Sequence, residues 1–176
     1  MNKDWNYVKL DKIIKYRKEF IEIDDFQKYK RCRVKLHAQG IELRDIVQGT
    51  EIKTKKQQIC RTDDFLVAEI DAKIGGFGIV PTNLDGAIVS SHYFLFEINE
   101  SLLGIKFLDY FIRTPAFRDQ VSAQGSTNYA AIRPNDVLGY TIPLPTLNEQ
   151  RRIVARIEEL LGKVEEVRSL RQQTLK

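Results

Sequence analysis

Two stretches of the chain show patterns that are typical of β-strands. Between residues 31 and 36, Cys32, Val34 and Leu36 alternate with basic residues, so one face of the strand is apolar and the other is basic. Residues 64–70 form a nearly continuous apolar run, which favours a central strand covered on both faces. The pattern therefore predicts a sheet with a buried inner strand and a basic strand that exposes one face.

Shorter apolar segments separated by turn signals predict the remaining elements. Residues 7–14 indicate a short strand that runs into a helical turn, and the glycines between residues 75 and 78 indicate a tight loop. The expected class is α+β: a mixed β-sheet or barrel-like domain with a few helices, followed by a long C-terminal helix. Further strands are expected at 41–47, 87–90, 93–98 and 137–142, and short helices at 102–112 and 116–123.

The C-terminal segment has the periodicity of a helix. Thr146 and Glu149 have the spacing of a capping box, which would start a helix near residue 147. A helix from there to the end would be about 45 Å long and would overhang the domain, so it predicts a helical partner. The alternative is a helix that folds back on its own domain. The apolar residues with coiled-coil seam spacing are Ile153, Ile157, Leu160, Val164 and Val167.

Composition narrows the class of protein. Hydrophobic residues make up 43% and charged residues 30%, which is ordinary for a globular protein, and no apolar run approaches the roughly 18–20 residues of a membrane span. The start of the chain lacks an apolar signal core, and the two cysteines suit a reducing compartment, so a cytoplasmic location without a membrane partner is expected. The two cysteines and two histidines are too scattered for a zinc site.

Positive charge is concentrated near the start of the chain. The net charge is +4 overall, and residues 1–60 alone carry +6, mostly in clusters at 28–35 and 53–56. Clustered Lys and Arg can neutralise DNA phosphates and release counterions, although a solvated strand face is an equally open alternative. The candidates for DNA contact in the first cluster are Lys28, Lys30, Arg31, Arg33 and Lys35.

Three other segments carry residues that suit DNA contact. Lys73 follows the central strand, and Gly76 would let the backbone approach a phosphate closely. Short polar side chains farther along can read base edges or hold phosphates, with ordinary turn chemistry as the alternative for each. These candidates are Ser91, His92, Gln124, Ser126, Thr127, Asn128 and Tyr129.

No catalytic motif is complete. The chain has no Walker phosphate loop, no Gly-x-Ser-x-Gly elbow and no Asn-Pro-Pro-Tyr segment of amino-methyltransferases. Asp71 and Lys73, with Asp63 and Asp64 upstream, resemble part of a magnesium-dependent nuclease site, but the usual preceding Pro-Asp is missing. The sequence therefore favours a chain without catalysis, cofactor or metal, with a nuclease as the less favoured alternative.

One segment is far more specific than these patterns. Residues 142–154, Ile-Pro-Leu-Pro-Thr-Leu-Asn-Glu-Gln-Arg-Arg-Ile-Val, resemble the Ile-Pro-Leu-Pro-x-Leu-x-Glu-Gln-x-x-Ile-Val signature of type I restriction-modification specificity subunits. Weaker agreement comes from Trp5-x-x-Val8-x-Leu10, from residues 64–66 and 75–78, and from Gly125-Ser126-Thr127. The resemblance covers nearly the whole chain.

The resemblance implies a target-recognition domain at residues 1–145 and a coiled-coil helix for dimerisation and subunit assembly at residues 146–176. It implies double-stranded DNA as a partner, with S-adenosylmethionine, ATP and Mg²⁺ on separate modification (methyltransferase) and restriction subunits. Family members typically carry two recognition domains and two helical segments, whereas this chain has one of each and resembles a half-subunit. Two copies are therefore expected to pair through antiparallel helices and to read a split palindrome.

Other interpretations stay open. A coiled-coil adaptor whose globular part binds protein would show no salt-sensitive binding to duplex DNA. The recognition portion of a combined restriction-methylation enzyme would be distinguished by its partner polypeptide. A natural half-subunit and a fragment of a longer chain are both compatible with the sequence.

Overall fold

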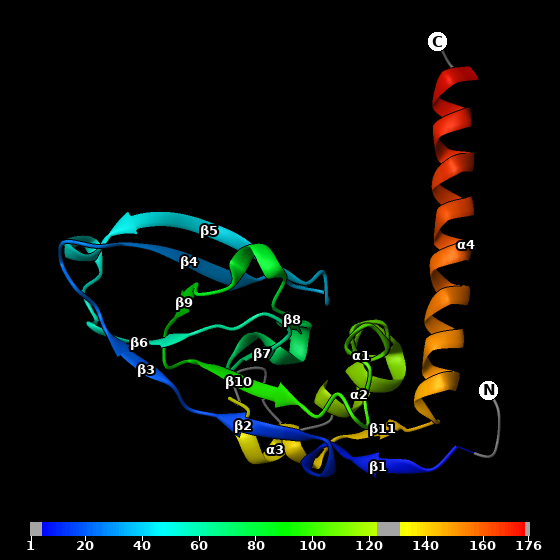
Figure 1. Ribbon diagram of the computed structural model, residues 1–176, viewed down its shortest axis with the longest axis horizontal. Helices are drawn as coiled ribbons and strands as arrows, with labels where there is room; N and C mark the ends of the chain where they lie inside the picture. Colours follow the sequence, from blue (N-terminus) through cyan, green and yellow to red (C-terminus); the bar gives the residue numbers. More distant parts are fainter. Residues whose placement is uncertain (1–4, 123–130, 175–176) are drawn as a thin grey trace.

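The computed structural model describes residues 5–122 and 131–174, and the strands in this part of the chain form three sheets (Figure 1). One sheet has the order β2-β10-β7-β8, a second has the order β3-β6-β9-β4-β5, and β1 pairs with β11. The strands are β1 (Tyr7–Lys9), β2 (Ile14–Arg17), β3 (Phe20–Glu22), β4 (Lys28–Val34), β5 (Ile41–Gln48), β6 (Lys56–Ile59), β7 (Phe65–Ala68), β8 (Phe77–Ile79), β9 (Ile88–Val89), β10 (Tyr93–Ile98) and β11 (Thr141–Pro143). The helices are α1 (Ile105–Ile112), α2 (Pro115–Ser122), α3 (Pro134–Gly139) and α4 (Leu147–Thr174), with 3-10 turns η1 (Leu10–Lys12), η2 (Gly49–Glu51), η3 (Asp71–Ile74) and η4 (Thr82–Leu84).

The α+β class and the long C-terminal helix are confirmed, and so is the central strand. All four residues of β7 are buried, and β10 and β8 pair with its two edges. Phe65 and Val67 belong to the core cluster on one face, whereas Leu66 and Ala68 belong to the cluster on the other. This two-sided burial explains why the segment is apolar without alternation.

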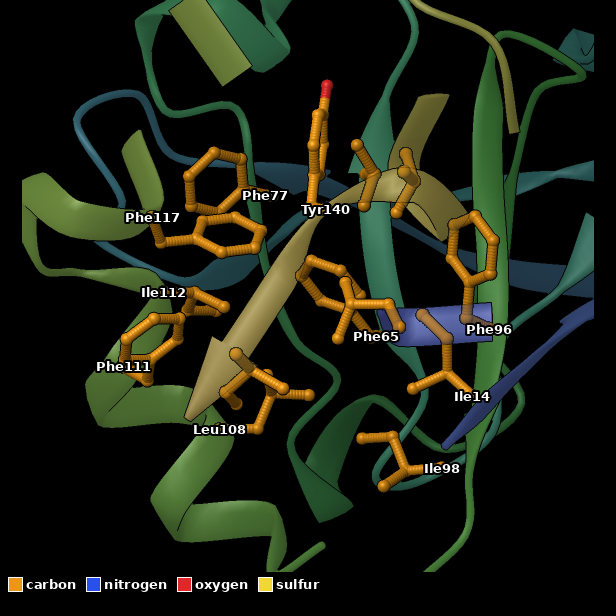
Figure 2. Packing of buried hydrophobic residues seen from close by; sticks show 14 of the residues in the cluster. Ile14, Phe65, Phe77, Phe96, Ile98, Leu108, Phe111, Ile112, Phe117 and Tyr140 are labelled. Atoms are coloured by element: carbon orange, nitrogen blue, oxygen red, sulfur yellow. The ribbon is translucent and has the colours of Figure 1, made fainter. Parts of the chain in front are cut away.

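Aromatic rings fill the core between the four-stranded sheet and the short helices (Figure 2). The buried ring of Phe117 lies edge-on to its neighbours, with centroid distances of 5.3 Å to Phe77, 6.0 Å to Phe111 and 5.7 Å to Tyr140. Such edge-to-face pairs are favourable beyond the area they bury. Helices α1 and α2 are thereby fixed against the sheet, and α1 in turn supports the base of α4.

Two expectations from the sequence are wrong. Only the end of the strand expected at 137–142 forms, as β11 from Thr141; residues 137–139 belong instead to helix α3, because Pro134 occupies the first helical position and Asp136 accepts the backbone N–H of Arg133 at 2.7 Å. Leu36 was expected on the apolar face of the basic strand, but β4 ends at Val34 and Leu36 is exposed. The chain turns there through His37 and Ala38, which both have positive φ.

Helix α4 is anchored at its N-terminal end by the residues of the proline–Glu-Gln segment. The amide of Gln150 is buried, accepts the backbone N–H of Gly104 at 2.7 Å, and donates to the carbonyls of Leu102 and Pro145, each at 2.9 Å. Only half of the expected capping box forms: the backbone N–H of Glu149 donates to Thr146 Oγ1, while the Glu149 carboxylate accepts from the indole of Trp5 at 3.0 Å. Beyond this anchor, the helix projects away from the globular body (Figure 1).

Candidate nucleic-acid interface

The basic strand expected from the sequence is β4, and its arginines are paired with acidic residues of β5. Arg31 donates from Nε and Nη2 to the two carboxylate oxygens of Asp45, each at 2.7 Å. This hydrogen-bonded ion pair holds the pKa of Asp45 below its ordinary value. Because Arg31 and Asp45 face each other in the β4–β5 register, the geometry of the hairpin itself makes the pair.

Two more basic side chains share an acidic partner on β5. Arg33 donates to Glu42 at 2.9 Å, and the ammonium of Lys35 lies 3.8 Å from the same carboxylate. Lys30 donates to the carbonyl of Asn83 at 3.1 Å, and Lys28 is exposed. Part of the charge expected to face DNA is thus already neutralised within the protein. The sequence reasoning missed Asp45 and Glu42, although both stand within the neighbouring predicted strand.

Arg31 and Arg33 nevertheless border a basic cavity of about 580 Å³. Arg44 lines it from β5 and Lys53 lines it from the loop after η2, so four basic side chains converge on it. The acidic group among the lining residues is Glu51. The side chains of Arg33 and Arg44 are 58% and 56% exposed, which leaves them accessible to an anionic polymer. A cavity with this charge balance suits phosphate groups.

Apolar and amide groups complete the lining of this basic cavity. Ile52 and Ile88 are almost fully buried, and Gln57 is 7% exposed. The Gln57 amide nitrogen donates to the carbonyl of Thr54 at 2.6 Å, which orients the side chain. An oriented amide can donate to and accept from a base edge. Neither Arg44 nor Gln57 was a candidate at the sequence level, because neither stands in a distinctive motif.

The candidate segment Ser91–His92 forms the turn between β9 and β10, beside the same cavity. Ser90 and Tyr93, on either side of it, both line the cavity. His92 Nδ1 lies 2.7 Å from one carboxylate oxygen of Glu69, and Arg133 Nη1 donates to the other at 2.8 Å. Sequence reasoning missed both Glu69 and Arg133, because they are 64 residues apart and only the fold brings them together.

The remaining candidates for DNA contact are Lys73 and Gly76, which the structure describes, and five residues between 124 and 129, which it does not. Lys73 lies half-buried in η3. Gly76 is buried, and a Cβ there would lie 2.7 Å from atoms of Asp71, so close packing inside the protein already requires a glycine. Its contact with DNA stays a prediction, and so does that of Lys73. Gln124, Ser126, Thr127, Asn128 and Tyr129 lie outside the described residues.

The acidic residues of the nuclease alternative do not come together. Asp63 and Asp64 precede β7 and Asp71 follows it, so the length of the strand separates them. Asp64 is buried, pairs with the guanidinium of Arg17, and accepts the backbone N–H of Arg61 at 2.7 Å. Burial raises the pKa of Asp64 despite the opposing effect of Arg17. Among the described residues, no three His, Cys, Asp or Glu side chains are grouped as metal ligands.

The five seam residues of α4 divide into two sets. Ile153 packs against the domain core, and Ile157 is half-buried. Leu160, Val164 and Val167 are 46%, 46% and 64% exposed, and Leu161 and Leu170 beside them are also exposed. The seam therefore starts inside the domain and continues along the projecting part of the helix.

An apolar groove lies at the point where the seam leaves the domain. It has a volume of about 380 Å³. Helix α4 contributes Ile153 and Ile157 to one wall, and its lining is almost entirely apolar. The other main lining residues are Trp5, Tyr110, Phe111 and Pro115.

A mixed-sheet domain with a converging basic cavity and a projecting helix that carries an apolar stripe defines a class, that of DNA-recognition domains with a helical extension. The chain belongs to the family of type I restriction-modification DNA specificity domains, since the model of that family matches residues 2–173. This family recognises DNA and is not catalytic, as the sequence predicted. A search of curated proteins found no match.

Solved structures agree with the family. The HsdS subunit from Thermoanaerobacter tengcongensis is similar over 98% of this chain and 46% of its own, with a TM-score of 0.80 and 26% identity. A chain from a structure titled as the basis of complex assembly and conformational transition of the type I R-M system has a TM-score of 0.78 and 27% identity, over 97% of this chain and 45% of its own. The S subunit from M. genitalium, at 16% identity and a TM-score of 0.57 over 97% of this chain and 43% of its own, shows a shared fold. This chain thus spans somewhat less than half the length of these relatives.

Helix α4 is the longest of the described helices. No helix in residues 5–122 and 131–174, α4 included, is both long and apolar enough to cross a membrane. Charged residues recur along α4 between its apolar positions. Its exposed apolar residues therefore form a stripe on a charged rod.

Proposed function

We propose that this chain recognises one half-site of a bipartite sequence in double-stranded DNA, using the basic cavity and the adjoining turn between β9 and β10. The observation that carries the proposal is the convergence of Arg31, Arg33, Arg44 and Lys53 on one cavity in a domain of a DNA-recognition family. Lys and Arg groups supply affinity by displacing counterions from phosphates. The oriented amide of Gln57 and the polar turn supply groups that can reach base edges.

A salt-dependence experiment tests this proposal. Arg33 and Arg44 are both replaced by Ala in the full chain, and binding to duplex DNA is measured by fluorescence anisotropy between 50 and 200 mM salt (about the range over which phosphate contacts dominate). We expect affinity to fall about 10- to 100-fold and the slope of log affinity against log salt to flatten by about 2. Arg31 is left in place because, with Arg44 replaced, its loss would take both arginine partners from Asp45, whereas Glu42 keeps Lys35 at 3.8 Å when Arg33 is replaced.

The matched control removes the same charge elsewhere. Lys12 and Lys106 are exposed and lie outside the basic cavity, so replacing both with Ala lowers the net charge equally. We expect their loss to leave the salt slope nearly unchanged. Equal effects of the two double variants would contradict the cavity assignment. Wild-type affinity that does not depend on salt would favour the protein-binding adaptor.

The exposed part of α4 supports pairing with a second copy. Seam residues 153, 157, 160, 164 and 167 are followed by Arg171, and this series is symmetric about residue 162. In an antiparallel pair centred there, Leu160 faces Val164 of the second copy and Ile157 faces Val167 of the second copy. The C-terminal turns of each helix then reach the apolar groove of the other copy. A two-fold pair of this kind would read a split palindrome.

Cysteine cross-linking tests this register. Leu160→Cys and Val164→Cys chains are mixed and oxidised; an antiparallel pair centred at residue 162 gives a disulfide-linked heterodimer in high yield. Each variant alone stays largely monomeric on the gel. Efficient formation of a Val164→Cys homodimer would indicate a parallel pair instead. The absence of cross-linked product in every mixture would contradict pairing through this seam. The native thiols of Cys32 and Cys60 are buried and serve as an internal control.

We also propose that different parts of the chain, and different subunits of a complex, have different roles. Residues 1–145 would bind DNA, and residues 146–176 would assemble the subunits. A modification subunit would supply methyl transfer from S-adenosylmethionine, and a restriction subunit would use ATP and Mg²⁺. The family and the length of the relatives support this scheme. Copurification of the tagged chain from native cells tests it: a separate methyltransferase supports the scheme, and a methyltransferase fused to a nuclease contradicts it.

A further inference from the structure

The carboxylate of Glu69 joins two exposed basic side chains at the edge of the basic cavity. Its side chain is 14% exposed, whereas the side chains of His92 and Arg133 are each 70% exposed. One carboxylate oxygen lies 2.7 Å from His92 Nδ1 and the other accepts from Arg133 Nη1 at 2.8 Å. A recessed acid thus holds two groups that project into solvent.

The backbone fixes all three residues in the same place. The Glu69 N–H donates to the carbonyl of His92 at 2.8 Å, and the Ile132 N–H donates to the carbonyl of Glu69 at 3.0 Å. Ile132 is buried on one side of Arg133, and Pro134 begins α3 on the other. The position of the Arg133 guanidinium is therefore set by backbone pairing, by a buried neighbour and by the Glu69 carboxylate together.

An exposed ion pair of this kind adds little to stability, because solvent screens it and long side chains lose freedom. A guanidinium that is already oriented by a carboxylate has a different advantage. It can present its remaining N–H groups to a fixed partner without losing further freedom on binding. In the major groove, the O6 and N7 acceptors of guanine match such a planar donor pair.

We infer that Arg133 is a specificity-determining residue that reads a guanine in the recognised half-site, and that Glu69 is its positioning residue. This inference rests on the proposed function, because it assigns one base contact within the proposed DNA-binding face. It adds Arg133 and Glu69 to a face otherwise made of the basic cavity and the β9–β10 turn.

Selection of bound duplexes from a randomised DNA library, followed by sequencing, tests the inference with the full-length chain. For Arg133→Ala, we expect the preference for one G·C pair to disappear while the other preferred positions remain. Affinity for the selected wild-type sequence should fall about 10- to 100-fold, and affinity for unrelated sequences should change much less. Glu69→Gln should weaken the preference at the same pair only, and Glu69→Gln added to Arg133→Ala should cost nothing further.

A matched control lies in the helical layer. Arg113 at the end of α1 donates to Asp109 at 2.6 Å and is likewise exposed, so Arg113→Ala removes a similar ion pair away from the proposed face. We expect the sequence selected by this variant to equal that of the wild type. Circular dichroism melting of all variants checks that the fold is kept.

The outcomes separate the inference from the function on which it rests. If the wild type selects a sequence and Arg133→Ala selects the same one, the base contact is wrong and the proposed function stands. If Arg133→Ala weakens binding to all sequences equally, Arg133 contacts phosphate and the inference is likewise overturned. If the wild type selects no sequence at all, the proposed function itself fails.

Discussion

The two halves of helix α4 differ sharply in what holds them. The half next to the domain is fixed by the three hydrogen bonds of the buried Gln150 amide, by the Trp5–Glu149 contact and by the packing of Ile153 and Val154 on the core. The Lys106 ammonium of α1 also donates to Glu158 at 2.6 Å, and the far half, residues 159–173, is exposed all round. A single helix therefore contains one segment that contacts the domain and one segment that projects into solvent.

The two roles of the helix are encoded in different parts of its sequence. The Glu-Gln pair of the specific sequence motif holds the helix to the domain through Trp5 and Gly104. Beyond it, Leu160, Val164 and Val167 of the apolar seam are exposed to solvent. Isolated helices in water are marginal, so the far half is expected to gain most of its stability from another helix.

The largest effect is expected at Gln150. Gln150→Ala leaves a backbone N–H and two carbonyls unpaired in a buried place, so the free energy of unfolding should fall by about 2–4 kcal/mol. Gln172→Ala, in the exposed far half, should change it by less than about 0.5 kcal/mol. Urea unfolding of both variants measures the free energy of unfolding. Equal losses of stability in the two variants would contradict the difference between the two halves.

Truncation of apolar side chains should affect the two halves of α4 unequally. Ile153→Ala should cost about 1–2 kcal/mol, since Ile153 is partly buried against the core. Val167→Ala should cost less than about 0.5 kcal/mol at low protein concentration, because Val167 is exposed. At high protein concentration, the melting temperature of Val167→Ala should fall below that of the wild type if the seam pairs. A wild-type melting temperature that does not change with protein concentration would contradict pairing.

A substitution in the far half offers a gain of stability. A Cβ at Gly162 meets nothing within 4 Å, so Gly162→Ala should stabilise the helix locally by about 0.5–1 kcal/mol through helix propensity. Hydrogen exchange should slow at amides of the far half and stay unchanged near Gln150. Slowing in both halves would mean that α4 opens as one unit.

The smallest effect on stability at neutral pH is expected at Tyr140, which is buried in the core of the globular domain. Burial raises the pKa of Tyr140 to about 12, and its hydroxyl has no partner in the described structure. Since the folded state holds this proton more tightly than the unfolded chain, its contribution is fully present below about pH 10 and is lost between about pH 10 and 12. Tyr140→Phe should change stability by no more than about 0.5 kcal/mol at pH 7 and should reduce the alkaline loss. Urea unfolding at pH 7, 9 and 11 measures both; an unchanged alkaline slope would contradict the assignment.

The elements whose patterns reflect local burial could be predicted from the sequence. β7 is apolar on both faces because β10 and β8 flank it and two core clusters cover it, and the seam of α4 repeats with helical spacing. The segment at 137–142 misled because Val137 and Leu138 suit a strand, whereas Pro134 and Asp136 set a helix start. Local capping outweighed intrinsic preference there.

The candidate interface was harder to predict, because it depends on contacts between distant residues. Nothing near Arg31 in sequence shows that Asp45 will neutralise it; that follows from the register of the hairpin. Similarly, Glu69, His92 and Arg133 come from three separate segments. The clusters of basic residues were visible in the sequence, but which of them remain available for a ligand depends on the fold.

The pairing of β1 with β11 has a consequence for how longer relatives can be built. It places the beginning of the described chain beside the root of α4, while the helix carries its other end roughly 40 Å away at 1.5 Å per residue. In an antiparallel pair, that far end arrives next to the first strand of the second copy. Gene duplication followed by fusion through a short linker would therefore convert two separate chains into one without changing the assembly, which fits relatives of about twice this length.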